Sequence, residues 1–142
     1  MERVKFKLPE NEVFKMPLTL MVNHMNYGNH LGNDSVMTLN HEARIQWLRS
    51  LGHTELDIYG AGLIQSDAMV MYRSEGHLGQ EIVLKLFVGE FNSKIINIYC
   101  QILDATTEKE IARIKNGLIF YDYEKKSMTQ VSETFLEKLR NV

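Results

Sequence analysis

The chain has 142 residues, 44% of them hydrophobic, and 16 basic residues nearly balance 18 acidic residues, for a formal net charge of -2. This length suits one domain with a sizeable core, and the scattered charges leave no basic surface for nucleic acid or an anionic membrane. The single cysteine, Cys100, excludes an intramolecular disulfide and lies in an apolar run, so we expect a buried thiol and a cytoplasmic protein. No apolar run approaches the length needed to span a bilayer, and residues 1–12 lack the apolar region of a signal peptide, so we expect neither feature.

The first predicted elements are a strand and a helix. Residues 13–22, VFKMPLTLMV, are β-like, and Pro17 favours an edge strand or a bulge there. Apolar residues then recur at three- and four-residue spacing over 35–51, which predicts one long helix. Asp34 or Ser35 can cap the start of this helix, and Gly52 is suited to end it.

Four extended runs follow the helix, separated by turn residues, and they predict an antiparallel meander at 63–74, 81–91, 94–104 and 110–124. Several runs are apolar on both faces, so we expect one face to cover the helix and the other to meet a second subunit. Ser132, as a cap, with Val131 and Leu136 as a staple, predicts a short terminal helix. One helix can cover only one face of the sheet, which gives an α+β fold whose sheet wraps the helix.

Polar residues on the predicted helix raise separate expectations. Asn40 falls within the apolar stripe, where a buried amide needs a partner from the loop, a second subunit or a substrate. Glu42 falls on the exposed side, and Arg44 is expected to snorkel to the surface. Gly60 and Gly62 are read as turn residues rather than as a nucleotide loop.

A polar loop, MNYGNHLGND, occupies residues 25–34 just before the helix. The simplest interpretation is a turn shaped by Gly28 and Gly32. Backbone N–H groups near the helix start, at the positive end of the helix dipole, could also stabilise an oxyanion. Asp34 is the nearest carboxylate, and His30 could act as an acid, a base or an orienting donor.

The element order, together with NHLGNDSVMTLNHEARIQWLRSLG across the loop and helix, resembles the hotdog-fold acyl-CoA thioesterases of the 4-hydroxybenzoyl-CoA type. The later segments DAMVMYRSEGHLGQEIVLKL and EIARIKNGLIFYDYEKK also resemble that family, so the resemblance runs nearly end to end. It implies a single hotdog domain over 1–142, with an antiparallel five- or six-stranded sheet wrapped around one long central helix and a short C-terminal helix.

In that family the loop typically reads Asp-x-x-Gly-His-Val-Asn-Asn before a helix that bears Glu-x-Ala-Arg. His30 takes the histidine position, Asn33 takes the second Asn position, and 42–44 anchor the helix. Asn26 stands where many members carry the catalytic Asp. Because Asn cannot accept a proton at neutral pH, the role of general base does not transfer to Asn26, but its amide can orient water or bind the thioester.

The resemblance implies hydrolysis of an acyl-CoA or acyl carrier protein thioester, without a cofactor, at a site shared between the loop and the partner in a homodimer that could pair into a tetramer. The candidate catalytic residues are Asn26, His30 and Asp34. The candidate substrate-binding residues are Gly32, Asn33, Asn40 and Arg73, the last because family members often meet the CoA phosphates there.

Two other functions stay open. A non-catalytic acyl-thioester binding protein would keep the pocket and lose the acid, as Asn26 suggests. A hotdog dehydratase or hydratase would pair a His with an acid, which His30 with Asp34 or Glu42 could mimic. The five histidines show no compact ligand spacing along the sequence, so no metal is expected.

Overall fold

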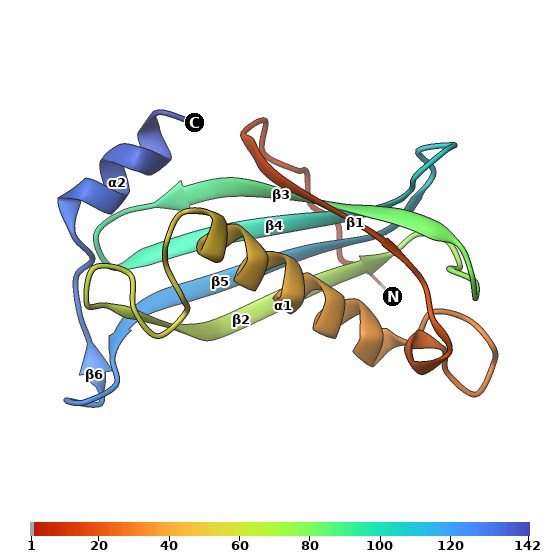
Figure 1. Cartoon of the computed structure of the whole chain (residues 1–142), viewed down its shortest axis with the longest axis horizontal. Coiled ribbons are helices and arrows are strands. Elements are labelled where there is room, and N and C mark those ends of the chain that lie inside the picture. Colours follow the sequence, from red (N-terminus) through yellow and green to blue (C-terminus); the bar gives the residue numbers. More distant parts are fainter. Residues whose placement is uncertain (1) are drawn as a thin grey trace.

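The computed structural model describes residues 2–142, and within them one antiparallel sheet of six strands carries a long helix on one face (Figure 1). The strands are β1 (Glu12–Thr19), β2 (Gly62–Tyr72), β3 (Glu81–Phe91), β4 (Ile95–Asp104), β5 (Glu110–Asp122) and β6 (Ser127–Met128). The helical elements are η1 (Val22–His24), α1 (Asn33–Ser50) and α2 (Glu133–Arg140). The predicted α+β architecture is therefore confirmed, while the short elements η1 and β6 were not predicted.

The strands follow the order β1-β3-β4-β5-β2, with β6 paired to the end of β5. Only β3, β4 and β5 form the predicted meander. The prediction is wrong for β2, which lies at the far edge and places Leu63 opposite Phe120 of β5. The helix α1 crosses the sheet before β2 begins, so the chain re-enters on the other side of the three-stranded meander (Figure 1). Pro17 lies on the edge strand β1, as predicted.

The two ends of α1 differ from each other in how well they were predicted. The N-cap is Gly32, in extended conformation and without a side-chain cap, so the prediction that Asp34 or Ser35 caps the helix is wrong. Asp34 instead lies inside the first turn. At the other end Gly52 has φ of 84° and donates its N–H to the Arg49 carbonyl at 2.9 Å, which confirms the glycine stop.

The core lies between α1 and the concave face of the sheet. Val36, Leu39, Ala43, Trp47 and Leu48 are the buried apolar residues of the helix stripe. The inward side chains of the central strands meet them, among them Cys100, which is fully buried. Burial raises the pKa of this thiol, so the group is neutral and acts as core packing, as predicted.

The convex face of the sheet is partly covered by the chain's own N-terminal segment. The rings of Phe6 and Tyr99 lie 5.8 Å apart, and Arg113 Nη1 donates to the Phe6 carbonyl at 2.8 Å. At the other end of the chain, Ser132 Oγ accepts from the Thr134 N–H at 3.2 Å and caps α2, as predicted. Among the helices described, none combines the length and the apolar character needed to cross a bilayer.

Candidate functional site

The loop between η1 and α1, residues 25–32, which we call the opening loop, is organised by the side chain of Asn26. Its Oδ1 accepts hydrogen bonds from the N–H groups of Gly28 at 3.0 Å and His30 at 3.2 Å. The backbone N–H of Asn26 also donates to the His30 carbonyl at 2.8 Å. These bonds use the acceptor half of the amide for the loop, and they leave the Nδ2 group of Asn26 for another partner.

Gly32 brings Asn26 and Asp34 together at the start of α1. A Cβ on residue 32 would lie 2.6 Å from Asp34 Oδ1 and 3.4 Å from Asn26 Cβ. The predicted residues Asn26, Gly32 and Asp34 therefore form one cluster, although Asp34 is not the cap. The absence of a side chain at Gly32 provides the space that the Asp34 carboxylate occupies.

The start of α1 is also electropositive. Gly32 supplies no side chain to bond the first-turn N–H groups, and no side-chain cap bond is found there in residues 2–142. These N–H groups are the positive pole of the helix dipole. Asn33, at the first helical position, is exposed beside them. The cluster thus combines backbone donors, a carboxylate and an amide.

The His30 side chain contacts the connection between β2 and β3. Its Nε2 lies 3.2 Å from Glu75 Oε2, and the next backbone group, the Leu31 N–H, donates to the Gly76 carbonyl at 2.8 Å. The two loops are thereby joined by main chain and side chains. His77 approaches the same carboxylate, with its Nε2 4.0 Å from Glu75 Oε2.

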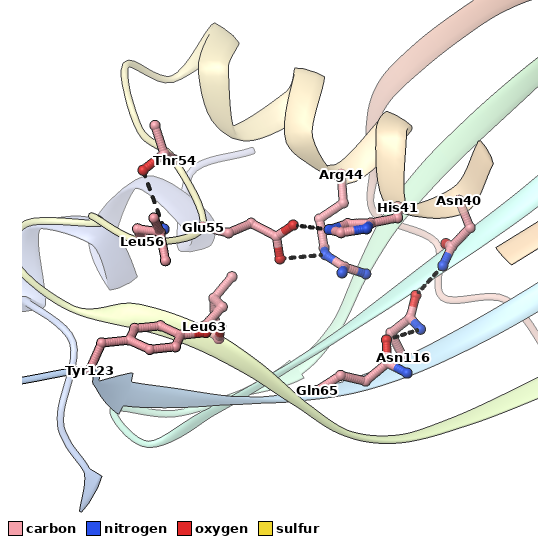
Figure 2. Close-up of polar contacts among 10 residues, drawn as sticks. All are labelled: Asn40, His41, Arg44, Thr54, Glu55, Leu56, Leu63, Gln65, Asn116 and Tyr123. Carbon is pink, nitrogen blue, oxygen red and sulfur yellow. Dashed lines mark hydrogen bonds and ion pairs between the residues drawn. The ribbon is translucent and has the colours of Figure 1, made fainter. Parts of the chain in front are cut away.

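Asn40 lies further along α1 and finds its partner in the sheet rather than in the loop (Figure 2). Its Nδ2 donates to Asn116 Oδ1 at 2.8 Å, and Asn116 Nδ2 donates to Gln65 Oε1 at 3.1 Å. Asn40 is 1% exposed and Asn116 is 0% exposed. The expectation of a buried amide with a partner is confirmed, and that partner lies on β5.

Glu55, from the segment after α1, binds two side chains of the helix (Figure 2). One carboxylate oxygen contacts His41 Nε2, and the other accepts from Arg44 Nε at 3.2 Å. Arg44 is 4% exposed, so the expectation that it snorkels to the surface is wrong. Its Nη1 is buried without a hydrogen-bond partner among the described residues. Glu42, in contrast, is exposed as predicted.

An open cleft of about 640 Å³ lies between the middle of α1 and the edge strand β2. Polar and apolar side chains line it together: Met37, Thr38, Asn40, His41, Arg44, Glu55, Leu63, Ile64, Gln65 and Tyr123. Sequence reasoning had identified only Asn40 as a site residue here. Asn116 could have been predicted as a buried polar residue, because it lies at two-residue spacing between Ile114 and Leu118 and so shares their buried face of β5.

Arg73, the remaining candidate, follows β2 directly. Its Nε lies 3.6 Å from Glu110 Oε1, its side chain is 56% exposed, and its backbone N–H donates to the Ile111 carbonyl at 2.8 Å. These contacts attach Arg73 to the start of β5. No contact among the described residues joins it to the opening loop.

The fold has many solved relatives at low sequence identity. A 1,4-dihydroxy-2-naphthoyl-CoA thioesterase from Synechocystis superposes with a TM-score of 0.81 at 13% identity, over 91% of this chain and 96% of that chain. The protein SAV2348 from Staphylococcus aureus, solved in complex with CoA, gives 0.83 at 12% identity, over 97% and 87%. The DHNA-CoA thioesterase from Staphylococcus aureus gives 0.76 at 12%, over 89% and 85%.

These likenesses confirm the predicted hotdog fold. A search of curated protein sequences gives no significant match. The sequence itself matches the model of the thioesterase-like superfamily over residues 21–139, a span that includes the opening loop, α1 and all of β2 to β6. The chain therefore belongs to the thioesterase-like superfamily.

Proposed function

We propose that the protein hydrolyses an acyl-CoA thioester at the start of α1. The observation that carries this proposal is the cluster around Gly32, where the Asp34 carboxylate and the side chain of Asn26 lie at a helix start whose backbone N–H groups have no side-chain cap. Thioester hydrolysis requires a base for the attacking water and donors for the developing oxyanion. The CoA bound to the structural relative from Staphylococcus aureus supports CoA over a carrier protein as the thiol half of the substrate.

In the proposed reaction, Asp34 takes a proton from water as the oxygen attacks the thioester carbon. The first-turn N–H groups of α1 hold the resulting oxyanion, and the free Nδ2 of Asn26 orients the water or the carbonyl. The oxyanion then collapses, the C–S bond breaks, and the proton held by Asp34 passes to the leaving sulfur, so that free thiol is released. His30 assists by fixing the loop, and Gly32 and Asn33 line the approach to the helix start.

We propose that two copies pair through the outer edge of β2. Among residues 2–142 this 11-residue strand pairs with no strand other than β5, and it has no proline, whereas the opposite edge strand β1 carries Pro17. Ile64, Met69 and Tyr72 expose large apolar side chains along β2, as expected for a surface that a partner covers. A partner on this edge would also close the cleft that Ile64 and Gln65 line, and would place Asn40 within an enclosed acyl site.

A second function is favoured by one observation. The Oδ1 atom of Asn26 accepts hydrogen bonds from the loop backbone and so does not act on water. This arrangement suits a protein that binds a thioester without hydrolysing it. The buried Cys100 agrees with a reducing compartment, and we place either activity in the cytoplasm.

The experiment is release of free thiol over a panel of aliphatic and aromatic acyl-CoAs, run beside a binding measurement on the same panel. Turnover of at least one acyl-CoA is expected. Asp34→Asn should lower that turnover about 100-fold, because it removes a general base, and should leave binding nearly unchanged. Glu42→Gln, on the exposed side of α1, is the matched control and should retain turnover.

Tight binding of an acyl-CoA without release of thiol would instead support the binding protein. Equal turnover in the wild type and a folded Asp34→Asn variant would remove Asp34 from the mechanism, and the base would then have to be sought elsewhere, with Glu55 in the cleft as the next candidate.

A further inference from the structure

We propose that His30, Glu75 and His77 form a binding site for a divalent transition-metal ion, with Zn²⁺ as the best match. This inference goes beyond the proposed hydrolysis and does not depend on it. Histidine spacing along the sequence predicted no metal, but the fold brings His30 of the opening loop beside the connection between β2 and β3. One ligand atom from each of the three residues lies within 4.8 Å of the others.

The distances suit one ion shared by three ligands. Zn²⁺ binds histidine nitrogen and carboxylate oxygen at about 2.0–2.2 Å, so ligand atoms around a tetrahedral ion lie roughly 3.3 Å apart. His30 Nε2 lies 3.2 Å from Glu75 Oε2, and His77 Nε2 lies 4.0 Å from the same oxygen. The His77 side chain is 59% exposed, and a small rotation would bring its nitrogen to the ion.

The backbones that carry the ligands are already fixed. The Leu31 N–H donates to the Gly76 carbonyl at 2.8 Å. This bond joins the residue after His30 to the residue between Glu75 and His77. Gly76 permits this approach, because a Cβ there would lie only 2.8 Å from Leu31 Cβ. The entropy cost of assembling the three ligands is therefore reduced before an ion binds.

A second set of bonds holds His77. Its N–H donates to Gln80 Oε1 at 2.9 Å, and Gln80 Nε2 donates to Asp104 Oδ2 at 2.8 Å. This chain of bonds anchors the turn that carries His77 to the end of β4. Ion binding would therefore require rotation of side chains but no movement of the backbone.

The ligand set also selects the class of ion. Two imidazoles and one carboxylate suit Zn²⁺ and its transition-metal neighbours, whereas Mg²⁺ and Ca²⁺ prefer oxygen ligands alone. Three protein ligands leave a position for solvent. The ion would bind Nε2 of His30. Coordination would then join the opening loop to the β2–β3 connection, in addition to the hydrogen bond that already links them.

The test is calorimetric titration of the tag-free protein with Zn²⁺, with Mg²⁺ as the comparison ion. One Zn²⁺ per chain is expected, with no saturable binding of Mg²⁺. His77→Ala and Glu75→Gln should each weaken Zn²⁺ binding at least about tenfold, because even loss of an outer-shell partner of a metal ligand typically costs that much affinity. Both side chains are more than half exposed, so the variants should fold, which circular dichroism without metal would check.

His41→Gln is the matched control. His41 also contacts a carboxylate, Glu55, but among the described residues this pair has no third metal-binding side chain beside it. Its Zn²⁺ affinity should equal that of the wild type. The proposal is overturned if the wild type shows no saturable binding at micromolar Zn²⁺, or if His77→Ala binds as tightly as the wild type. Neither result bears on thiol release by the metal-free protein, so failure of this site and failure of the proposed hydrolysis are distinguishable.

Discussion

Asn40 on α1 donates a hydrogen bond of 2.8 Å to Asn116 on β5, and both amides are almost completely buried. A buried polar group that loses its partner retains the cost of its desolvation. Asn40→Ala should therefore lower the free energy of unfolding by about 2 kcal/mol in urea denaturation.

The double variant Asn40→Ala/Asn116→Ala checks the cause of that loss. It should cost less than the two single changes added together, with a coupling energy of about 1 kcal/mol, because the two amides share one bond. Glu42→Ala, on the exposed side of the same helix, should change stability by less than about 0.5 kcal/mol. Additive single effects would show that the amides act independently.

Gly32→Ala tests the position of the Asp34 carboxylate. The backbone at Gly32 has φ of -73°, which any residue adopts, so the substitution should not strain the main chain. The new methyl group would lie 2.6 Å from Asp34 Oδ1 and would push this exposed carboxylate away. Thiol release should fall at least about tenfold, since catalysis depends on ångström-scale placement, while melting temperature changes little.

Gly28→Ala is the control for that change. A Cβ at Gly28 would meet Asn26 Oδ1 at 3.4 Å and His30 Nδ1 at 3.7 Å, which are ordinary contacts. Turnover should be retained. An equal loss of turnover in both variants would point to general disturbance of the loop rather than to displacement of Asp34.

Asn26 can be separated into its two amide functions. Asn26→Ala removes both the loop acceptor and the free Nδ2, and should lower turnover. Asn26→Asp keeps an acceptor for the N–H groups of Gly28 and His30 but has no N–H donor in place of Nδ2. Its turnover should therefore stay as low as that of Asn26→Ala. Turnover equal to that of the wild type would contradict a role for Nδ2 at the substrate.

His53 makes stability depend on pH. Burial, with a smaller effect of Lys138, lowers the pKa of this imidazole below its usual 6.5, against an opposing effect of Asp57. Its ring packs edge-on against Tyr59 and Phe135, with centroids 4.6 and 5.7 Å away. Above pH 6.5 the ring is neutral in both the folded and the unfolded chain, so its contribution is fully present.

As the pH falls below 6.5, the unfolded chain binds the proton first, and this contribution to stability is lost through the lower folded-state pKa. The melting temperature should therefore fall between about pH 7 and about pH 5. His53→Phe keeps an aromatic ring without a titrating group, and its melting temperature should fall less over the same range. Parallel curves would exclude His53 as the cause.

The proposed pairing through β2 predicts a dimer in light scattering after size exclusion. Met69→Arg places a charge on this edge strand and should shift the mass toward the monomer, because two like charges would meet or be buried at the contact. Leu78→Arg, at a more exposed apolar residue in the β2–β3 connection, should leave the mass unchanged. A dimer that persists in Met69→Arg would place the interface elsewhere.

The local elements of the fold could be predicted because each rests on a pattern within one segment. The stripe from Val36 to Trp47 fixes the buried face of α1, and Gly52 ends the helix in a left-handed conformation. The start of the helix could not be fixed in this way. Gly32 as N-cap depends on how closely Asn26 and the Asp34 carboxylate pack against residue 32, which the residue types alone do not show.

Long-range pairings were beyond the sequence for the same reason. Nothing in the helix sequence shows that Arg44 is buried, because its carboxylate partner Glu55 returns from the segment after the helix. His30 and His77 likewise come together only when the two loops join. The family resemblance indicated that the opening loop carries the site. The cleft around Asn40 could not be predicted, because it forms only where α1 packs against the sheet.

The position of β2 beside β5 has a consequence for the order of folding. The strands β3, β4 and β5 join through short turns, whereas pairing Gly62 with Tyr121 closes a long chain segment and loses more chain entropy. We therefore expect the three-stranded meander to form first and β2 to join late. Truncation of Val70 on β2 should then speed unfolding more than it slows folding. The edge that a partner would use would thus become available only after the meander has formed.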